Sequence, residues 1–276
     1  MDIHMIRAFY GINMREFLRF FQQRARFLSA LVRPLIWLLV FSAGWRTTQG
    51  LAPYPPYQTY IPYEVYMVPG LCAMIQLFNG MQSSLSMIYD REMGSMRVLL
   101  TTPLPRWFIL VSRLLASVAV SILQVYAFLA IAFIFTYFEW LEIDVEPIGY
   151  LTVLPALILS GFMLGALGMA LSSTVKQLEN FAGVMNFVIF PMFFISSALF
   201  PLWRIKDLSY TFYQFCQYNP FTYAVELIRF ALHGQFHPMA AAVVGATALI
   251  AFLLAIYSYD PARGIQASPK GAKGPA

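Results

Sequence analysis

The amino-acid sequence predicts an all-α membrane protein with six transmembrane helices, and three observations support this class. Hydrophobic residues make up 59% of the 276-residue chain and charged residues 11%, with a mean hydropathy of +0.65. Soluble domains carry about 25% charged residues. Several apolar stretches reach the roughly 20 residues that a helix needs to cross the hydrocarbon core. They are too long for β-barrel strands and do not alternate apolar with polar residues.

We predict one transmembrane domain over residues 1–260, with spans at about 27–46, 65–89, 107–138, 147–175, 180–203 and 238–259. Asp, Glu, Lys and Arg are absent from Val65–Tyr89, Leu114–Phe138, Pro147–Val175, Asn180–Trp203 and Pro238–Tyr259. The first span contains Arg33. This residue lies about 9 Å along the helix from Phe27, so its side chain is expected to snorkel to the headgroup layer. Residues 261–276, rich in Gly, Pro, Ala and Lys, are predicted to form a disordered cytoplasmic tail.

The charges of the loops predict the orientation of the chain. With six spans, twelve loop and terminal Lys and Arg residues lie on the side of the N terminus and four on the opposite side. The loop after the third span has no Lys or Arg and carries Glu139, Glu142, Asp144 and Glu146. By the positive-inside rule, both termini of this multi-pass protein face the cytoplasm, which places the chain in the cytoplasmic (inner) membrane. The charged N-terminal sequence predicts no cleavable signal peptide.

Two segments on the cytoplasmic side are predicted to form amphipathic helices. In residues 3–26, aromatic side chains alternate with arginines, as in a helix that lies in the headgroup layer. This helix is either an anchor for the first span or a lever that touches a cytoplasmic partner, and the two roles are compatible. Residues 88–107 open with charged residues and continue with apolar ones before Pro103 and Pro105. That helix is either an ordinary interfacial helix or one whose apolar edge docks into a groove on another protein.

The last outer segment, Pro201–Pro238, is too long for a tight turn and too polar for a span. Glu226 and Arg229 are three residues apart, so they share a helical face and can pair. Together with Pro191 and Pro201, this pattern predicts a helix that breaks and re-enters the membrane from outside. Such irregular backbone is tolerated at membrane depth where protein or a water-filled cavity surrounds it.

Several kinds of site are not supported by the sequence. His233 and His237 are four residues apart, but Gly234 lies between them and no Cys or carboxylate stands near enough to complete a metal site. The positions of Cys72 and Cys216 do not favour a disulfide. The basic residues lie between apolar runs, which argues against nucleic-acid binding. The spans lack the acidic groups typical of proton- or sodium-coupled carriers.

Two motifs give the sequence a resemblance to the membrane subunit of ABC transporters of the type-2 exporter family. The first is an acid-R-E-x-G-S/T-x-x-x-L-L-x-T-P pattern, present here as Asp90–Ser95 and Leu99–Pro103. The second is N-P-F/L-T-Y followed by Glu and Arg, present here as Asn219–Tyr223, Glu226 and Arg229. With the N-terminal interfacial helix and the six spans, the resemblance covers nearly the whole chain.

The resemblance implies which residues act and with which partners. It makes the loop Tyr89–Pro105 a coupling helix that docks into a cytoplasmic ABC ATPase subunit, with the contact residues Asp90, Arg91, Glu92, Gly94, Ser95, Met96, Leu99 and Leu100. It makes Pro191–Gly234 the re-entrant helices that close the outer pathway, with the gate residues Pro191, Pro201, Asn219, Pro220, Glu226 and Arg229. It also implies a second permease subunit, expected to form a homodimer surrounded by membrane lipid.

The chain has no G-x-x-x-x-G-K-[ST] phosphate loop. No cofactor is therefore expected in this chain, and ATP and Mg²⁺ would bind the partner ATPase. The cargo is expected to be hydrophobic, amphipathic or a glycan-lipid. The alternatives are a lipid-modifying intramembrane enzyme, whose only candidate groups are Glu226, Arg229, His233 and His237, and an ATP-independent channel or carrier. Gly161, Gly165 and Gly168 are spaced for close helix approach, either within the chain or between two copies.

Overall fold

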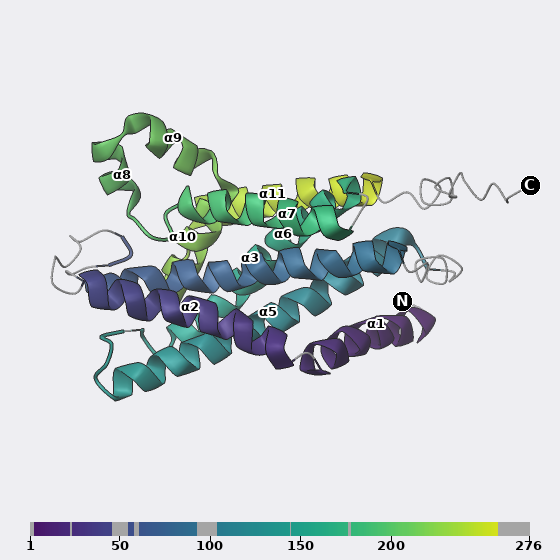
Figure 1. Ribbon diagram of the computed structural model, residues 1–276, viewed down its shortest axis with the longest axis horizontal. Coiled ribbons are helices and arrows are strands. Elements are labelled where there is room, and N and C mark those ends of the chain that lie inside the picture. The colour runs from purple at the N-terminus through teal and green to yellow at the C-terminus, as the bar shows by residue number, and fades with distance from the viewer. Residues whose placement is uncertain are drawn as a thin grey trace, which may run out of the picture.

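The computed structural model describes residues 3–22, 24–45, 55–57, 61–92, 104–143, 145–175 and 178–258. Within these ranges the chain forms ten helices and no strand, which confirms the predicted all-α class (Figure 1). The helices are α1 (Ile3–Gln22), α2 (Arg24–Trp45), α3 (Tyr63–Glu92), α5 (Arg106–Tyr137), α6 (Gly149–Thr174), α7 (Leu178–Phe194), α8 (Leu202–Leu208), α9 (Tyr210–Tyr218), α10 (Pro220–Leu232) and α11 (Pro238–Ser258).

Three helical stretches are long and apolar enough to cross a membrane, namely Arg106–Tyr137, Gly149–Ser173 and Pro238–Ser258. They coincide with three of the predicted spans. Within the predicted span 180–203, α7 ends at Phe194 and residues 195–200 are not helical. Shorter apolar helical stretches occur at Ala30–Ser42 and Gly183–Phe194, within α2 and α7. Helix α3 has the length of a span but carries Gln76, Asn79 and Gln82 near its middle.

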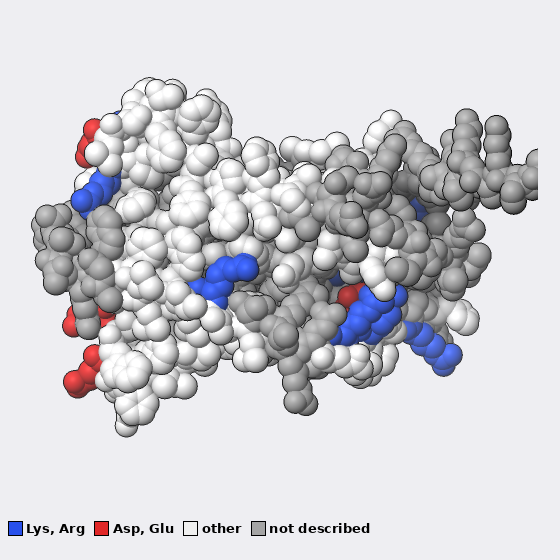
Figure 2. Space-filling view, in the orientation of Figure 1, with Lys and Arg blue, Asp and Glu red and all other residues white. Residues whose placement is uncertain are grey.

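The long helices run roughly along one axis, and α3 lies among them (Figure 1). It packs against α2, α5, α6, α7 and α10, and every residue from Tyr63 to Met81 is buried. The start of α1 and the ends of α3 and α11 lie at one end of the bundle, while α8 and α9 project at the other. In Figure 2 the flank is mostly uncharged, and acidic side chains gather at the end where α8 and α9 lie.

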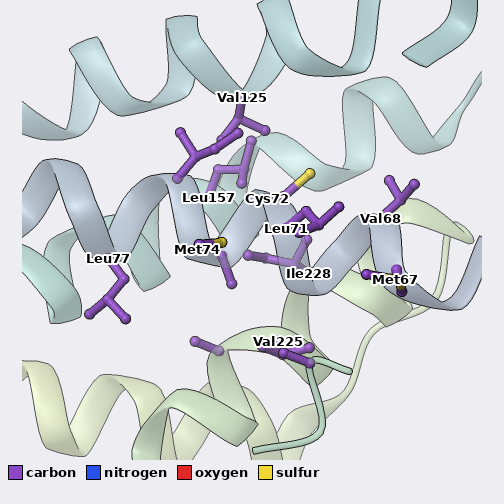
Figure 3. Close-up of a cluster of buried hydrophobic side chains, with 14 of the residues drawn as sticks. Met67, Val68, Leu71, Cys72, Met74, Leu77, Val125, Leu157, Val225 and Ile228 are labelled. Carbon is purple, nitrogen blue, oxygen red and sulfur yellow. The ribbon is translucent and has the colours of Figure 1, made fainter. Parts of the chain in front are cut away.

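Helix α10 forms part of the central core even though it is only 13 residues long. Figure 3 shows Val225 and Ile228 of α10 beside Leu71 and Met74 of α3. All four side chains are buried in the same hydrophobic cluster, which also includes Val125 of α5 and Leu157 of α6. Packing of this kind holds helices together in lipid, where dispersion contacts rather than exclusion of water favour association. Helix α10 therefore belongs to the bundle and is not part of a surface loop.

The glycines of α6 pack within the chain. A Cβ atom on Gly80 of α3 would lie 2.9 Å from the backbone nitrogen of Gly165, and one on Gly168 would lie 2.9 Å from the Gly80 carbonyl oxygen. A Cβ on Gly161 would lie 3.0 Å from the Gln76 amide nitrogen. The backbones of α3 and α6 thus approach as closely as small residues permit. Of the two possibilities left open by the sequence, the structure shows contacts within one copy.

Helix α1 has the properties expected of an interfacial helix. Ile6, Tyr10, Met14 and Leu18 recur every four residues and are all exposed, so one face of α1 presents an apolar stripe. On another face Phe20 is buried, and the helix packs against α5. An exposed apolar stripe beside basic residues suits the boundary between headgroups and acyl chains. Both roles considered for this segment, anchor and lever, are compatible with this packing.

Candidate functional site

The polar side chains of α10 start from a capped N terminus. Asn219 accepts a hydrogen bond from the Phe221 amide at 3.0 Å, and Pro220 occupies the first helical turn. Both residues favour the start of a helix. The Asn side chain accepts from a backbone N–H that has no partner within the helix, and proline lacks an N–H group at a position where that group would have no helical partner. The Asn219 side-chain amide also donates to the carbonyls of Met192 at 2.7 Å and Ile195 at 2.5 Å. One residue therefore begins α10 and fixes it to the end of α7.

Arg229 lies at the centre of the site and is fully buried. It forms the predicted ion pair with Glu226, donating from Nη1 to Oε1. Its Nη2 donates to the carbonyl of Ser197 at 2.8 Å, and its guanidinium carbon lies 4.0 Å from the ring centroid of Tyr66. A planar guanidinium suits such a site because it can pair, donate and stack at once. We call Tyr57, Tyr66, Ser197, Glu226 and Arg229 the outer cluster.

Tyrosines of α3 bind the same non-helical segment that follows α7. The hydroxyl of Tyr66 donates to the Ser197 carbonyl at 2.8 Å, and that of Tyr63 donates to the Leu199 carbonyl at 2.7 Å. The segment presses closely on α3, because a Cβ atom on Gly70 would lie 2.5 Å from the Ala198 carbonyl oxygen. Residues 196–199 are buried, so their carbonyl groups need protein partners. The outer cluster thus joins α3, α10 and the end of α7.

Tyr57 closes the cluster from the segment before α3. Its ring meets the His233 ring edge to face, with 4.8 Å between centroids. Burial raises the pKa of Tyr57 to about 12, against the opposing effect of the positive charge on Arg229. The phenol is therefore neutral at physiological pH. His233 Nδ1 lies 3.0 Å from the Arg229 carbonyl, so this histidine belongs to the packing around the cluster.

His233 and His237 occupy different environments despite their spacing in the sequence. Helix α10 ends at Leu232, and Gly234 has a φ of 66°, in the left-handed region that glycine tolerates. His237 instead accepts a hydrogen bond from the Ala240 amide at 3.0 Å and packs against the Phe230 ring. It thereby supports the start of α11. Among the described residues, no three His, Cys, Asp or Glu side chains gather where they could hold a metal ion.

Sequence reasoning missed several residues of this end of the molecule. Glu64 is buried, accepts from the Ser42 hydroxyl at 3.1 Å and from the Glu142 amide at 3.2 Å, and so links α2 and α3 to the segment after α5. Tyr63 and Tyr66 were also missed as hydrogen-bond donors, and Tyr57 was missed as a ring contact of Tyr66 and His233. The available signals were an acid directly before an apolar run and two tyrosines spaced three apart. Neither signal reveals the partners, which lie 22 and 78 residues from Glu64 and 136 and 131 residues from Tyr63 and Tyr66.

The predicted site residues are only partly brought together. Asn219, Pro220, Glu226 and Arg229 share α10 or its cap. Pro191 lies within α7 and is exposed, and Pro201 starts α8 and is buried. At the opposite end of the bundle, Asp90, Arg91 and Glu92 form the last turn of α3. The remaining predicted coupling residues, Gly94, Ser95, Met96, Leu99 and Leu100, lie outside the described residues.

A bundle of apolar helices whose bonded polar cluster lies near one end defines an integral membrane protein of the helical class. Comparison with known families identifies it further. Residues 7–233 match the ABC-2 type transporter family, and the chain belongs to that family. The match spans α1 through the end of α10, and so includes both predicted motifs. The chain is a transport permease by family.

Individual relatives agree with this assignment. The chain is 29% identical over 231 residues to the protein named transport permease ycf38 of Cyanophora paradoxa, covering 82% of this chain and 74% of the relative. It is 27% identical over 227 residues to the ycf38 protein of Porphyra purpurea, with the same coverage. It is 24% identical over 213 residues to Nodulation protein J of Rhizobium leguminosarum bv. viciae, covering 76% of each chain.

Proposed function

We propose that this chain is the transmembrane subunit of an ATP-driven ABC exporter, with six spans and both termini on the cytoplasmic side of the inner membrane. The observation that carries the proposal is the family match over residues 7–233. The sequence contains no phosphate-loop motif for binding a nucleotide. Energy for transport would therefore come from a separate ATPase subunit. Two copies of the chain would form the substrate pathway between them.

The proposed contact with the ATPase is the segment Tyr89–Pro105. Support comes from the helices that flank it, because α3 extends to Glu92 and α5 begins at Arg106. The end of α3 lies at the same end of the bundle as α1 and the end of α11 (Figure 1). A force applied to this segment would reach α3 directly, and α3 packs against five other helices. The segment is thus well placed to move the bundle when a nucleotide-dependent partner moves it.

The proposed outer gate is formed by α9, α10 and the segment after α7. Asn219 and Arg229 tie α10 to that segment, and Val225 and Ile228 place its middle against α3. We infer that α9 and α10 form a re-entrant pair, with the N terminus of α10 deep in the membrane and its C terminus near the outer surface. Irregular backbone at such depth is stable when protein surrounds it, as it does at residues 196–199.

The alternative of an intramembrane enzyme is less well supported by the same residues. A catalytic group must reach its substrate within hydrogen-bonding distance. Arg229 is fully buried and engaged by Glu226, by the Ser197 carbonyl and by the Tyr66 ring. His233 and His237 each bond to the backbone of a helix end. The cluster has the properties of a structural joint and not those of a reaction centre.

Co-expression tests the proposal. The tagged full chain would be produced with each ABC ATPase encoded by its source organism, purified in detergent and reconstituted in liposomes. We expect one ATPase to co-purify in a stoichiometric complex and to hydrolyse ATP. Glu92→Ala and Gly94→Pro should each lower that complex or its hydrolysis at least about tenfold, because loss of a charged contact or of the local helix weakens docking.

Glu146→Ala provides a matched control. Glu146 is an exposed carboxylate in the segment between α5 and α6, on the side opposite the proposed ATPase contact. Its loss should leave the complex and its hydrolysis unchanged. Retention of a fully active complex in both Glu92→Ala and Gly94→Pro would refute the proposed coupling segment. Cargo movement at full rate without any ATPase, or modification of lipid by the chain alone, would refute the exporter function.

A further inference from the structure

Arg33 lies about midway across the proposed membrane region. Its guanidinium carbon is 3.9 Å from the ring centroid of Phe78 on α3. At 1.5 Å per residue, Phe78 is about 16 Å from Tyr89 at the cytoplasmic end of α3 and about 22 Å from Tyr63 at the outer end. With the proposed spans, this contact places the Arg33 guanidinium away from the headgroup layer to which it was expected to snorkel. The guanidinium stacks on an aromatic ring at a depth where headgroups are absent.

The surroundings of Arg33 are apolar and open. Arg33 is exposed on α2, and so are its neighbours Val32, Ile36 and Val40. Figure 2 shows one basic patch midway along the mostly uncharged flank of the bundle. Within the described residues, no carboxylate forms an ion pair with Arg33. A charge at this depth is costly, and for that reason an intramembrane ionisable residue is by default a candidate functional group.

An aromatic surface continues from Arg33 towards α7. Trp37, one turn further along α2, stacks on Phe41 at 5.2 Å between centroids. Its ring also meets Phe193 edge to face and Phe194 at a tilt, both at 5.7 Å. Trp37, Phe41 and Phe194 thus form a wholly or partly exposed aromatic wall contributed by α2 and α7, and the buried rings of Phe78 and Phe193 support Arg33 and Trp37 from beneath. Arg33 is the cation at the end of this wall nearer the cytoplasm.

We propose that Arg33 receives the anionic group, a phosphate or carboxylate, of an amphipathic cargo whose apolar part lies along the aromatic wall. The inference rests on the proposed transport function and narrows the cargo to anionic amphiphiles. A guanidinium binds phosphate and carboxylate through two parallel hydrogen bonds. In a medium of low dielectric constant, such a pair is much stronger than it is in water. Charge complementarity therefore selects an anionic amphiphile over a neutral or cationic one.

Two other sources of the anion fit the structure less well. A bulk lipid has its phosphate at the membrane surface, more than a dozen ångströms from Arg33 by the helix-rise estimate above. A second copy of the chain has no carboxylate at the right depth, since none of its 13 Asp and Glu residues lies inside the six predicted spans. Glu226, the acidic residue of the outer cluster, is already paired with Arg229. A cargo molecule passing the wall can bring an anion to this position.

The test is a binding measurement on the full chain in phosphatidylcholine nanodiscs, without any ATPase. Radiolabelled hexadecyl phosphate is the anionic probe, and hexadecyl maltoside is the neutral one. We expect hexadecyl phosphate to bind at least about tenfold more tightly than the maltoside. Arg33→Gln should abolish that preference and leave maltoside binding unchanged. Arg33→Lys should give an intermediate preference, because the charge remains but the two parallel hydrogen bonds and the stacking on Phe78 are lost.

Control arms separate the possible sources. Arg7→Gln, in α1 outside the spans, should bind both probes as the wild type does. Inorganic phosphate should not compete with hexadecyl phosphate, because it has no apolar part to lie along the wall. Nanodiscs of phosphatidylglycerol should give the same preference as those of phosphatidylcholine, because the lipid headgroups remain at the surface. Competition with hexadecyl phosphate by inorganic phosphate or by phosphatidylglycerol would show that the anion comes from solution or from bulk lipid, and would overturn the proposal.

Three further results would overturn it. They are the absence of a preference for the phosphate probe in the wild type, retention of the full preference by Arg33→Gln, and loss of dimer formation by Arg33→Gln on gel filtration with probe binding intact. The last result would make Arg33 a subunit contact. Failure of the ATPase co-purification would refute the exporter function without altering these binding results, so the two proposals fail separately.

Discussion

The outer cluster and the glycine contact both join α3 to its neighbours, but they do so by different means. At the outer cluster, side chains of Tyr66 and Arg229 donate hydrogen bonds to a backbone carbonyl. At the glycine contact, Gly80 and Gly165 bring two helix backbones together with no side chain between them. Hydrogen bonds can be broken and remade by rotation of a side chain, whereas close backbone packing permits only small displacements. The comparison shows a joint made by side-chain hydrogen bonds at the outer end and a joint made by backbone packing in the middle.

The largest effect is expected from breaking the ion pair of the outer cluster on one side only. Arg229→Met removes the cation and leaves Glu226 buried and unpaired, which costs about 3–5 kcal/mol. We expect this variant to be poorly folded, with a markedly lower melting temperature by fluorescence-detected gel filtration. The double variant Arg229→Met with Glu226→Leu should recover much of that loss, because no buried charge remains. Equal melting temperatures for the single variant and the wild type would show that the pair is not structural.

A smaller but still clear effect is expected at the joint made by backbone packing. Gly80→Ala adds a methyl group 2.9 Å from the backbone of α6. Overpacking of this kind costs about 1–3 kcal/mol. Gly245→Ala in α11 is the matched control, because no atom lies within 4 Å of its added Cβ and alanine favours a helix. We expect a lower melting temperature for Gly80→Ala and an equal or higher one for Gly245→Ala, and the opposite order would refute the close packing.

The smallest effect is expected at the cap of α10. Asn219→Ala removes a cap and two hydrogen bonds to the end of α7, at a cost of about 1–2 kcal/mol. Ser209→Ala provides the comparison, because the Ser209 hydroxyl caps the exposed helix α9 by accepting a single hydrogen bond from the Phe212 amide. We expect the melting temperature to fall more for Asn219→Ala than for Ser209→Ala. Equal shifts would mean that the bonds from Asn219 to α7 add nothing to its capping role.

The sequence predicted the helical class and the strongest spans well. The predicted spans 107–138, 147–175 and 238–259 agree closely with α5, α6 and α11, because charges and prolines mark their ends. Within the predicted span 180–203, the helix ends at Phe194 and not at the end of the span. The segment carries no charged residue, so hydropathy could not detect that ending. Apolarity shows that a segment lies in lipid, but not where its backbone turns.

The site was predicted in part for a similar reason. The pairing of Glu226 with Arg229 follows from their spacing within one helix, and it is present. The roles of Tyr63 and Tyr66 depend on carbonyl groups more than 130 positions along the chain. Arg33 was expected at the headgroup layer because its position was measured along α2 alone, and the stacking on Phe78 depends on how α2 and α3 pack. Contacts between distant segments carry no local signal.

The acceptors at the outer end are the main-chain oxygens of Met192, Ile195, Ser197 and Leu199. Every peptide unit offers such an oxygen, whatever side chain it bears. The hydrogen bonds that attach α3 and α10 would therefore survive a change of side chain at these four positions, whereas loss of a tyrosine, asparagine or arginine donor would remove them. Distant kin of this protein should keep the donors, while the acceptor positions vary among side chains that fit the same buried packing.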